Sequence, residues 1–299
     1  MKFVTAQWNE EIFVGAINET ETKVLPLRKA GEKKFGSSKL PITMLECIAN
    51  GAAFIDEAMK LLTWANDNEE LFLPLESVKL LAPIPRPSKN IFCVGKNYAD
   101  HAIEMGSKDD IPEHVMVFTK APTTVIGHQE SILSHSELTA QLDYEGELAV
   151  IIGKKGRAIK QEEALDYIFG YTILNDITAR DIQVRHKQFF IGKSLDTTCP
   201  MGPWITYAKV IANPNKLNIQ TTVNGEVRQK SNTENFIFPI EEVISVLSSG
   251  MTLEPGDIIA TGTPAGVGKG FKPPRFLKPN DTIEITVEGI GTLTNQIKQ

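Results

Sequence analysis

Gln141–Gly153 reads QLDYEGELAVIIG, an apolar run preceded by alternating carboxylates. Leu148–Ile152 are uninterrupted apolar residues closed by a glycine, which is typical of a buried strand. Asp143, Glu145 and Glu147 stand at every second position, and in an extended chain such side chains point to the same face. Like charges so close repel, and buried charge is costly unless it is paired or bound to a metal. This face therefore needs either a cation or solvent.

A hard divalent cation would account for the carboxylates. Mg²⁺ prefers six oxygen ligands in octahedral geometry and usually keeps some positions for water or substrate. Asp176 ends a second apolar stretch, ILND, and is the best source of a third carboxylate. The other interpretation places Glu145 and Glu147 on the solvated face of an edge strand, where alternating glutamates are common. The pair alone leaves both interpretations open.

The bulk composition argues against several classes of protein. The 299 residues carry a net charge of -6 without a block of Lys or Arg, which disfavours nucleic acid as the main partner. No apolar run approaches the roughly 18 residues that span a membrane, and the first residues lack the apolar segment of a secretory signal. Cys47, Cys93 and Cys199 are odd in number and far apart, as expected for reduced thiols. We therefore expect a cytoplasmic protein without a membrane partner.

A proline-rich stretch divides the chain. Residues 1–82 are predicted to form a small N-terminal α/β domain of short strands and a helical segment that Gly51 interrupts. APIPRPSKN (82–90) is predicted to link this domain to residues 88–299, because prolines end strand ladders. The second part has many short strands and a hairpin turn at Asn224–Gly225. Because regular βαβ alternation is missing, we predict an α+β fold with mixed, coiled β structure rather than a doubly wound sheet.

Two further groups of residues could carry chemistry. His101 and Glu104 are three residues apart in a predicted helix, where such side chains are neighbours. A carboxylate bonded to one ring nitrogen raises the basicity of the other, which suits a general base, but an ordinary solvated pair has the same spacing. Lys193, in FIGKSLD, is a surface side chain on the ordinary interpretation. TGTPAGVG (261–268) lacks the Lys-Ser/Thr of a phosphate-binding loop, so nucleotide binding is disfavoured.

Five motifs occur in an order that is similar to that of a known enzyme family. They are VGKNYADHAIEM (94–105), DYEGELAVIIGK (143–154), GYTILNDITARD (170–181), FIGKSLDTTCPMGP (190–203) and ATGTPAGVG (260–268). Over about residues 88–299 the chain resembles the fumarylacetoacetate hydrolase superfamily, and most closely its branch of acylpyruvate hydrolases and oxaloacetate decarboxylases. The N-terminal unit resembles the small domain of the longer bacterial members. The resemblance implies a coiled, mixed β-roll, a homodimer, and a site that holds Mg²⁺ or Mn²⁺.

The resemblance also implies roles for individual residues. Glu145, Glu147 and Asp176 become the metal ligands, which favours the cation over the solvated edge strand. Asp143 has no ligand counterpart, and it is expected either beside the site, paired with a cation such as Lys193, or exposed to solvent.

The catalytic group implied by the resemblance consists of His101, Glu104 and Lys193. His101 and Glu104 become a base dyad on a segment that orders as a lid, and the polar stretch 106–114 suits a mobile lid. Lys193 faces the substrate and offsets negative charge that builds on an oxygen.

Four residues are expected to contact the substrate. The fork of an arginine suits a carboxylate of the substrate, and it suits Asp181 or Asp143 equally well as a partner of Arg180. Thr263 and the amides of its loop are implied to hold the substrate carboxylate. The complete set of expected substrate contacts is Arg180, Gln183, Thr263 and Lys120.

These residues predict a metal-dependent enzyme that cleaves a C–C bond in a small 2-oxo acid. A metal that chelates the 1-carboxylate and 2-keto oxygens makes loss of electron density from C3 easier. Decarboxylation of oxaloacetate to pyruvate and CO₂ is the favoured reaction, and hydrolysis of an acylpyruvate or fumarylpyruvate, or an isomerisation, is the alternative. A non-enzymatic scaffold is disfavoured, because a member that had lost catalysis would be expected to lack at least one of these residues.

Overall fold

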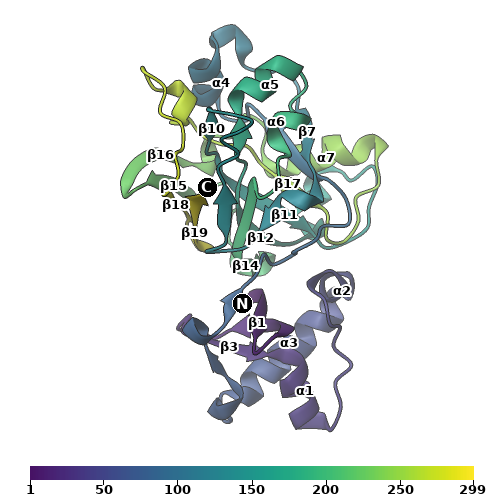
Figure 1. Cartoon of the computed structure of the whole chain (residues 1–299). Helices are drawn as coiled ribbons and strands as arrows, with labels where there is room; N and C mark the ends of the chain where they lie inside the picture. Colours follow the sequence, from purple (N-terminus) through teal and green to yellow (C-terminus); the bar gives the residue numbers. More distant parts are fainter.

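The computed structural model describes residues 1–299 as two parts, one above the other in Figure 1. The lower part is the N-terminal unit, in which strands pack against three helices. Its elements are β1 (Lys2–Trp8), β2 (Glu11–Ile17), β3 (Lys23–Pro26), α1 (Leu27–Phe35), α2 (Met44–Ala49), α3 (Ala52–Ala65), β4 (Leu73–Pro74) and β5 (Lys79–Leu80).

Local sequence explains most of the helical boundaries in this unit. The Thr43 hydroxyl accepts from the backbone N–H of Glu46 at 3.3 Å, and the Glu46 carboxylate accepts from the N–H of Thr43 at 3.1 Å, which closes a capping box at the start of α2. Gly51 separates α2 from α3 with a φ of 54°, so the predicted interruption is confirmed. Helix α1 was not predicted, because LRKAGEKKF is mostly polar and contains a glycine.

A large mixed sheet joins the two parts of the chain. Its strand order is β4-β3-β2-β1-β14-β12-β11-β17-β6-β7, with β5 paired to β1 and β8 paired in parallel to β14. Strand β11 lies in the interior of this sheet and is buried along its whole length, as the apolar run predicted. The strands that the upper part contributes to this sheet are β6 (Ile91–Gly95), β7 (Met116–Lys120), β8 (Val125–Ile126), β11 (Gly146–Ile152), β12 (Ile168–Asn175), β14 (Cys199–Tyr207) and β17 (Ile258–Ala260).

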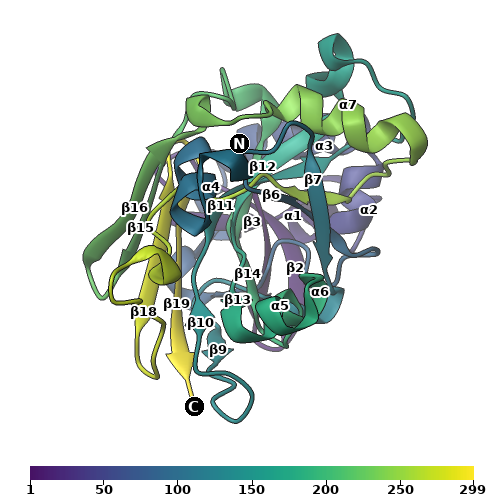
Figure 2. The same ribbon diagram turned by 90° about the horizontal axis from the view of Figure 1, so that it is seen from above.

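A second sheet of five strands flanks the large one, as the view from above shows (Figure 2). Its order is β16-β15-β18-β19-β9. Asn224 and Gly225 have φ angles of 53° and 78°, so the predicted hairpin turn between β15 and β16 is confirmed. The five strands are β9 (Ser131–Leu133), β15 (Asn218–Val223), β16 (Glu226–Asn232), β18 (Thr282–Val287) and β19 (Gly291–Lys298).

The N-terminal unit shares hydrogen bonds and a core with the rest of the chain. Strand β1 pairs with β14 through Lys2 opposite Thr206. The ring of Phe3 lies 5.0 Å from that of Phe54 in α3 and 5.9 Å from that of Phe169 in β12, measured between centroids. One apolar cluster therefore runs from the N-terminal helices into the large sheet. The division into domains 1–82 and 88–299 stays a prediction.

Short elements gather at the upper end of the large sheet (Figure 1). A 3₁₀ helix, η5 (Gln161–Tyr167), leads directly into β12. No helix is long and apolar enough to cross a membrane. The remaining strands and α-helices are β10 (Leu142–Asp143), β13 (Thr178–Ala179), α4 (Ala99–Met105), α5 (Arg180–His186), α6 (Phe190–Lys193) and α7 (Ile240–Gly250). Two of the other 3₁₀ helices are η3 (Lys108–Asp110) and η8 (Gly268–Gly270).

Candidate active site

Antiparallel pairing of β11 with β12 brings three carboxylates together. Gly146, the first residue of β11, lies opposite Asn175, the last residue of β12. Glu145 and Glu147 are the two neighbours of Gly146 in the chain, and Asp176 directly follows Asn175. The backbone N–H of Asp176 donates to the carbonyl of Glu145 at 2.8 Å. One oxygen from each carboxylate lies within 4.8 Å of the others.

Burial decides against the solvated edge strand. The exposed fractions of Glu145, Glu147 and Asp176 are 4%, 2% and 0%, and their strand lies between two neighbours in the sheet. Burial and the charges of Asp176 and Glu145 raise the pKa of Glu147 well above its usual value. Glu145 behaves differently: burial opposes its ionisation, but the charges of Lys193 and Arg180 lower its pKa. Glu145 is thus ion-paired within the protein, whereas Glu147 forms no ion pair and accepts the backbone N–H of Gly262.

The donor set fits a hard divalent cation. Three carboxylates that face one another supply only oxygen ligands, which Mg²⁺ and Mn²⁺ prefer. The Oδ1 atom of Asp176 is buried and has no aligned hydrogen-bond donor, although Lys120 Nζ lies 2.9 Å away.

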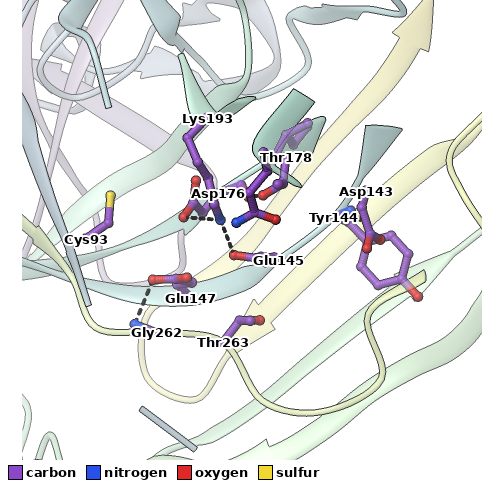
Figure 3. Close-up of polar contacts among 12 residues, drawn as sticks. Cys93, Asp143, Tyr144, Glu145, Glu147, Asp176, Thr178, Lys193, Gly262 and Thr263 are labelled. Carbon is purple, nitrogen blue, oxygen red and sulfur yellow. Dashed lines mark hydrogen bonds and ion pairs between the residues drawn. The ribbon is translucent and has the colours of Figure 1, made fainter. Parts of the chain in front are cut away.

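Lys193 projects from α6 between two of the carboxylates (Figure 3). Its Nζ donates to Glu145 Oε2 at 2.6 Å and to Asp176 Oδ2 at 2.8 Å, and it lies 4.9 Å from the ring centroid of Phe118. The side chain is 2% exposed, so the surface interpretation of Lys193 is wrong.

Lys120 occupies a different place from the one we expected. It ends β7 and is fully buried, and its Nζ contacts Asp176 Oδ1, the carbonyl of Ile177 at 3.0 Å and the carbonyl of Lys193. It does not line the pocket described below. The ammonium group therefore supports Asp176 and the chain around α6. The expected contact of Lys120 with substrate stays a prediction, since the side chain is buried outside the pocket.

Asp143 pairs with Arg180, which was one of the alternatives for Arg180, and not with Lys193, the cation that we named as an example for Asp143. The Nε of Arg180 donates to Asp143 Oδ2 at 2.9 Å, and its Nη1 lies 2.7 Å from Glu145 Oε1. Asp143 is fully buried, so its solvent-exposed interpretation is also wrong. The reason is a break at Tyr144: Asp143 belongs to the short strand β10, which pairs with β13 immediately before Arg180. The alternation of the three carboxylates therefore does not continue through one strand.

His101 and Glu104 are neighbours on α4, as their spacing predicted. His101 Nδ1 lies 3.4 Å from Glu104 Oε2, and His101 is 6% exposed, so it is not a solvated side chain. The carboxylate of Glu104 also accepts from the backbone N–H of Gly266 at 2.9 and 3.1 Å. Glu104 thus joins the helix that carries His101 to the glycine-rich loop.

The glycine-rich loop uses its donors within the protein. The N–H of Gly262 donates to Glu147 Oε2 at 2.7 Å, and that of Gly268 donates to Asp143 Oδ1 at 2.7 Å. The Thr263 hydroxyl donates to the carbonyl of Gly146 at 2.9 Å and accepts from Gln229. To bind substrate, Thr263 or these amides would have to replace their present hydrogen bonds within the protein with bonds to the substrate. Their role in substrate binding stays a prediction.

The side chains surround a cavity of about 230 Å³. Ligand pockets for drug-sized molecules run from roughly 300 Å³ upwards, so this one suits a smaller molecule. Of the expected residues, seven line it: His101, Glu145, Glu147, Arg180, Gln183, Lys193 and Thr263.

Residues 90–298 match the family described as fumarylacetoacetate (FAA) hydrolase, C-terminal. The chain belongs to the fumarylacetoacetate hydrolase family. The resemblance read from the five motifs is therefore confirmed, and the protein is an enzyme, as we predicted.

Relatives extend the similarity over the whole chain. The oxaloacetate tautomerase YisK of Bacillus subtilis is 58% identical over 301 residues, which cover 99% of this chain and 100% of the relative. A solved fumarylacetoacetate hydrolase from Exiguobacterium antarcticum is 40% identical, with a TM-score of 0.84 over 100% of this chain and 99% of its own. A 2-hydroxyhepta-2,4-diene-1,7-dioate isomerase from Mycobacterium marinum is 30% identical, with a TM-score of 0.73 over 100% and 98% of the two chains.

Several residues that line the pocket of this hydrolase-family enzyme were not predicted from the sequence as site residues. Phe118 and Phe189 form an edge-to-face pair 5.4 Å apart in the wall beside Lys193. Two lysines lie in or directly after the family motifs, Lys96 in VGKNY and Lys269 after ATGTPAGVG, and both line the pocket. Their place in those motifs is the indication that could have identified them.

Proposed function

We propose that the protein is a divalent-metal-dependent enzyme that acts on oxaloacetate through its enol and keto forms. The observation that carries this proposal is the buried Glu145–Glu147–Asp176 cluster, of which Glu145 and Glu147 line a small pocket together with cationic side chains. The name of the B. subtilis relative, oxaloacetate tautomerase, supports the choice of substrate. Oxaloacetate was also our first choice from the sequence.

Glu145, Glu147 and Asp176 would hold the metal, and Mg²⁺ or Mn²⁺ fits their oxygen ligands best. When bound, such a cation polarises the 2-keto oxygen and stabilises the negative charge that develops there. Lys193 adds a fixed positive charge to the same region, since its Nζ contacts two of the three carboxylates. Lys120 contacts Oδ1 of Asp176, the oxygen that Lys193 does not contact.

His101 is the residue we assign to proton transfer. It lines the same pocket as Glu145 and Glu147. With Nδ1 directed to Glu104, the Nε2 atom is left to take a proton from C3 and to return it. Removing the C3 proton and protonating the oxygen at C2 converts the keto form into the enol, and the reverse order restores the ketone.

Two related reactions remain open to the same residues. If the C4 carboxylate leaves as CO₂, the enolate of pyruvate remains and needs one proton at C3, so decarboxylation uses the same oxygen-stabilising groups. If C4 is a ketone, His101 and Glu104 could instead activate water for hydrolysis of the C3–C4 bond. Arg180, Gln183 and Thr263 would then position the acid. Tautomerisation is favoured over hydrolysis by the name of the 58% identical relative.

The wider setting of the enzyme is also a proposal. We propose a homodimer that works in the cytoplasm, and a coiled β-roll over residues 88–299 that carries a separate small domain over 1–82. The resemblance of the motifs supports the dimer and the roll. The proline-rich linker supports the division of the chain.

The test follows the enol of oxaloacetate by its ultraviolet absorbance, starting from each tautomer. Wild-type protein loaded with Mg²⁺ or Mn²⁺ should speed the approach to equilibrium above the rate of the metal alone, and EDTA should abolish the effect. Carbon-13 NMR of the same samples reports any pyruvate formed, and acetylpyruvate in place of oxaloacetate reports hydrolysis. Unchanged enol–keto kinetics with metal-loaded protein would refute tautomerisation.

A further inference from the structure

The pocket contains more cationic side chains than its carboxylates can pair with. Lys193 is held by Glu145 and Asp176, and Lys96 forms an ion pair of 2.9 Å with Asp110. Lys187 is exposed at the rim. Lys269 is half-buried in the wall, and its ammonium group has no ion pair or hydrogen bond in the protein.

The backbone of Lys269 is nevertheless fixed. Its N–H donates to Asp143 Oδ2 at 3.0 Å, and the preceding N–H, of Gly268, donates to Oδ1 of the same carboxylate. Gly268 has no room for a side chain, because an added Cβ would lie 2.4 Å from the carbonyl of Arg275 and 2.6 Å from Asp143. The loop therefore fixes the backbone position from which the Lys269 side chain reaches the pocket.

Arg180 presents a second unused donor beside it. The same Asp143 oxygen that accepts from the N–H of Lys269 also accepts from Arg180 Nε. Arg180 Nη1 is used by Glu145, but Nη2 is buried without any partner. Both cations line the pocket, and burial and the charge of Arg180 lower the pKa of Lys269. A buried donor without a partner is costly unless a ligand satisfies it.

We propose that Lys269 and Arg180 Nη2 form a subsite for a second carboxylate of the substrate, so that Lys269 selects 2-oxo dicarboxylic acids over 2-oxo monoacids. The inference rests on the proposed function, because it takes the Glu145–Glu147–Asp176 cluster as the place where the 2-oxo acid end binds. Arg180 contacts Glu145 directly, so the subsite adjoins that cluster. The acid selected is therefore short, with its two carboxylates separated by about two carbons, as in oxaloacetate.

The test compares oxaloacetate with its 4-methyl ester, which keeps the carbon skeleton but removes the second charge. The variants are Lys269→Met and Lys269→Arg, both loaded with Mg²⁺, and Lys278→Met removes an exposed positive charge as the control. We expect Lys269→Met to lower the ratio of kcat/KM for the diacid over the ester on the order of 10–100-fold, mainly through KM, as expected for a lost charged hydrogen bond. Lys269→Arg should recover part of the ratio, and Lys278→Met should leave it unchanged. An equal loss on both compounds, or no loss, would overturn the assignment.

A binding measurement separates this inference from the choice of reaction. Calorimetry of the Mg²⁺-loaded proteins would compare 3,3-difluorooxaloacetate, which has no C3 hydrogen, with oxalate, which has no distal carboxylate. Lys269→Met should lower the affinity for difluorooxaloacetate on the order of 10–100-fold, and the affinity for oxalate much less. If wild-type protein fails to convert oxaloacetate but shows this pattern, the proposed reaction is wrong and the subsite stands. If the variant binds difluorooxaloacetate as tightly as wild type does, the subsite is refuted whatever the reaction.

Discussion

The backbone N–H of Asp176 donates to the carbonyl of Glu145 at 2.8 Å, although the two residues are 31 positions apart in the chain. The bond continues the ladder of β11 and β12 beyond its last regular pair. It fixes the separation of two carboxylates by backbone geometry and not by flexible side chains. A site built in this way holds its ligands in place before any metal binds.

Removing a carboxylate of the cluster should abolish metal-dependent turnover. Glu147→Gln and Asp176→Asn keep the side-chain volume but remove a charged ligand, so metal affinity should fall by more than the roughly 10–100-fold that loss of a supporting hydrogen bond costs. Calorimetric titration with Mn²⁺ measures the affinity, and the turnover of oxaloacetate gives the activity. Glu284→Gln, on an exposed face of β18, is the matched control. Normal Mn²⁺ affinity in Glu147→Gln would remove this residue from the ligand set.

Replacing His101 should separate proton transfer from decarboxylation. His101→Ala should lower tautomerisation and any acylpyruvate hydrolysis by the factor of a lost general base, on the order of 10²–10⁴. Decarboxylation of oxaloacetate should fall less, because CO₂ can leave without a base at C3. Steady-state kinetics of both reactions, corrected for the metal alone, make the comparison, with the exposed His186→Ala as control. Equal losses in all reactions would show that His101 does more than transfer a proton.

The segment 98–115 should be protected when a 2-oxo acid mimic binds. Glu104 ties α4 to Gly266 through two contacts, while the following stretch around η3 is mostly exposed, so its opening is expected to cost little. Hydrogen exchange read by mass spectrometry, with and without oxalate on the Mg²⁺-loaded enzyme, measures the change. Peptides from α7 supply the internal control. Identical exchange over 98–115 in both samples would argue against a lid.

Lys120 should matter for stability as well as for the site. Lys120→Met removes the buried cation next to Asp176 and leaves that carboxylate with one partner fewer, which typically costs about 3–5 kcal/mol. Urea unfolding in EDTA measures the free energy of unfolding. Lys79→Met, which breaks the exposed pair with Glu130, should cost less than about 1 kcal/mol. If the two variants lose equal stability, the contact of Lys120 with Asp176 is not a stabilising one.

The three cysteines should be unreactive in the folded protein. All are buried free thiols. Burial raises the pKa of Cys47 and of Cys199 to about 12, and that of Cys93 well above its ordinary value. A raised thiol pKa means that almost no thiolate exists near pH 8, and only the thiolate reacts. Iodoacetamide at pH 8 should therefore label none of them in the native state and all three in guanidinium, as counted by mass spectrometry. Labelling of native protein at any of these positions would contradict this.

Some features followed from the sequence because they depend on residues that are close along the chain. The apolar run Leu148–Ile152 predicted a buried strand, whatever the neighbours of that strand in the sheet. Asn224–Gly225 specified its turn because both residues tolerate a positive φ. The spacing of His101 and Glu104 made them neighbours on any helix. The ordered motifs then indicated the family.

Other features were decided only by the tertiary structure, because they join residues that the sheets bring together from distant parts of the chain. Periodicity could not show that β10 ends at Asp143, before β11 begins, or that Asp143 pairs with Arg180. Nor could it show that β7 directs Lys120 behind Asp176, outside the pocket. Lys269 lies in the pocket wall because Asp143, 126 residues earlier, holds its backbone N–H. Strand pairing and register set these contacts, and local sequence patterns do not encode which distant partner a buried charge will meet.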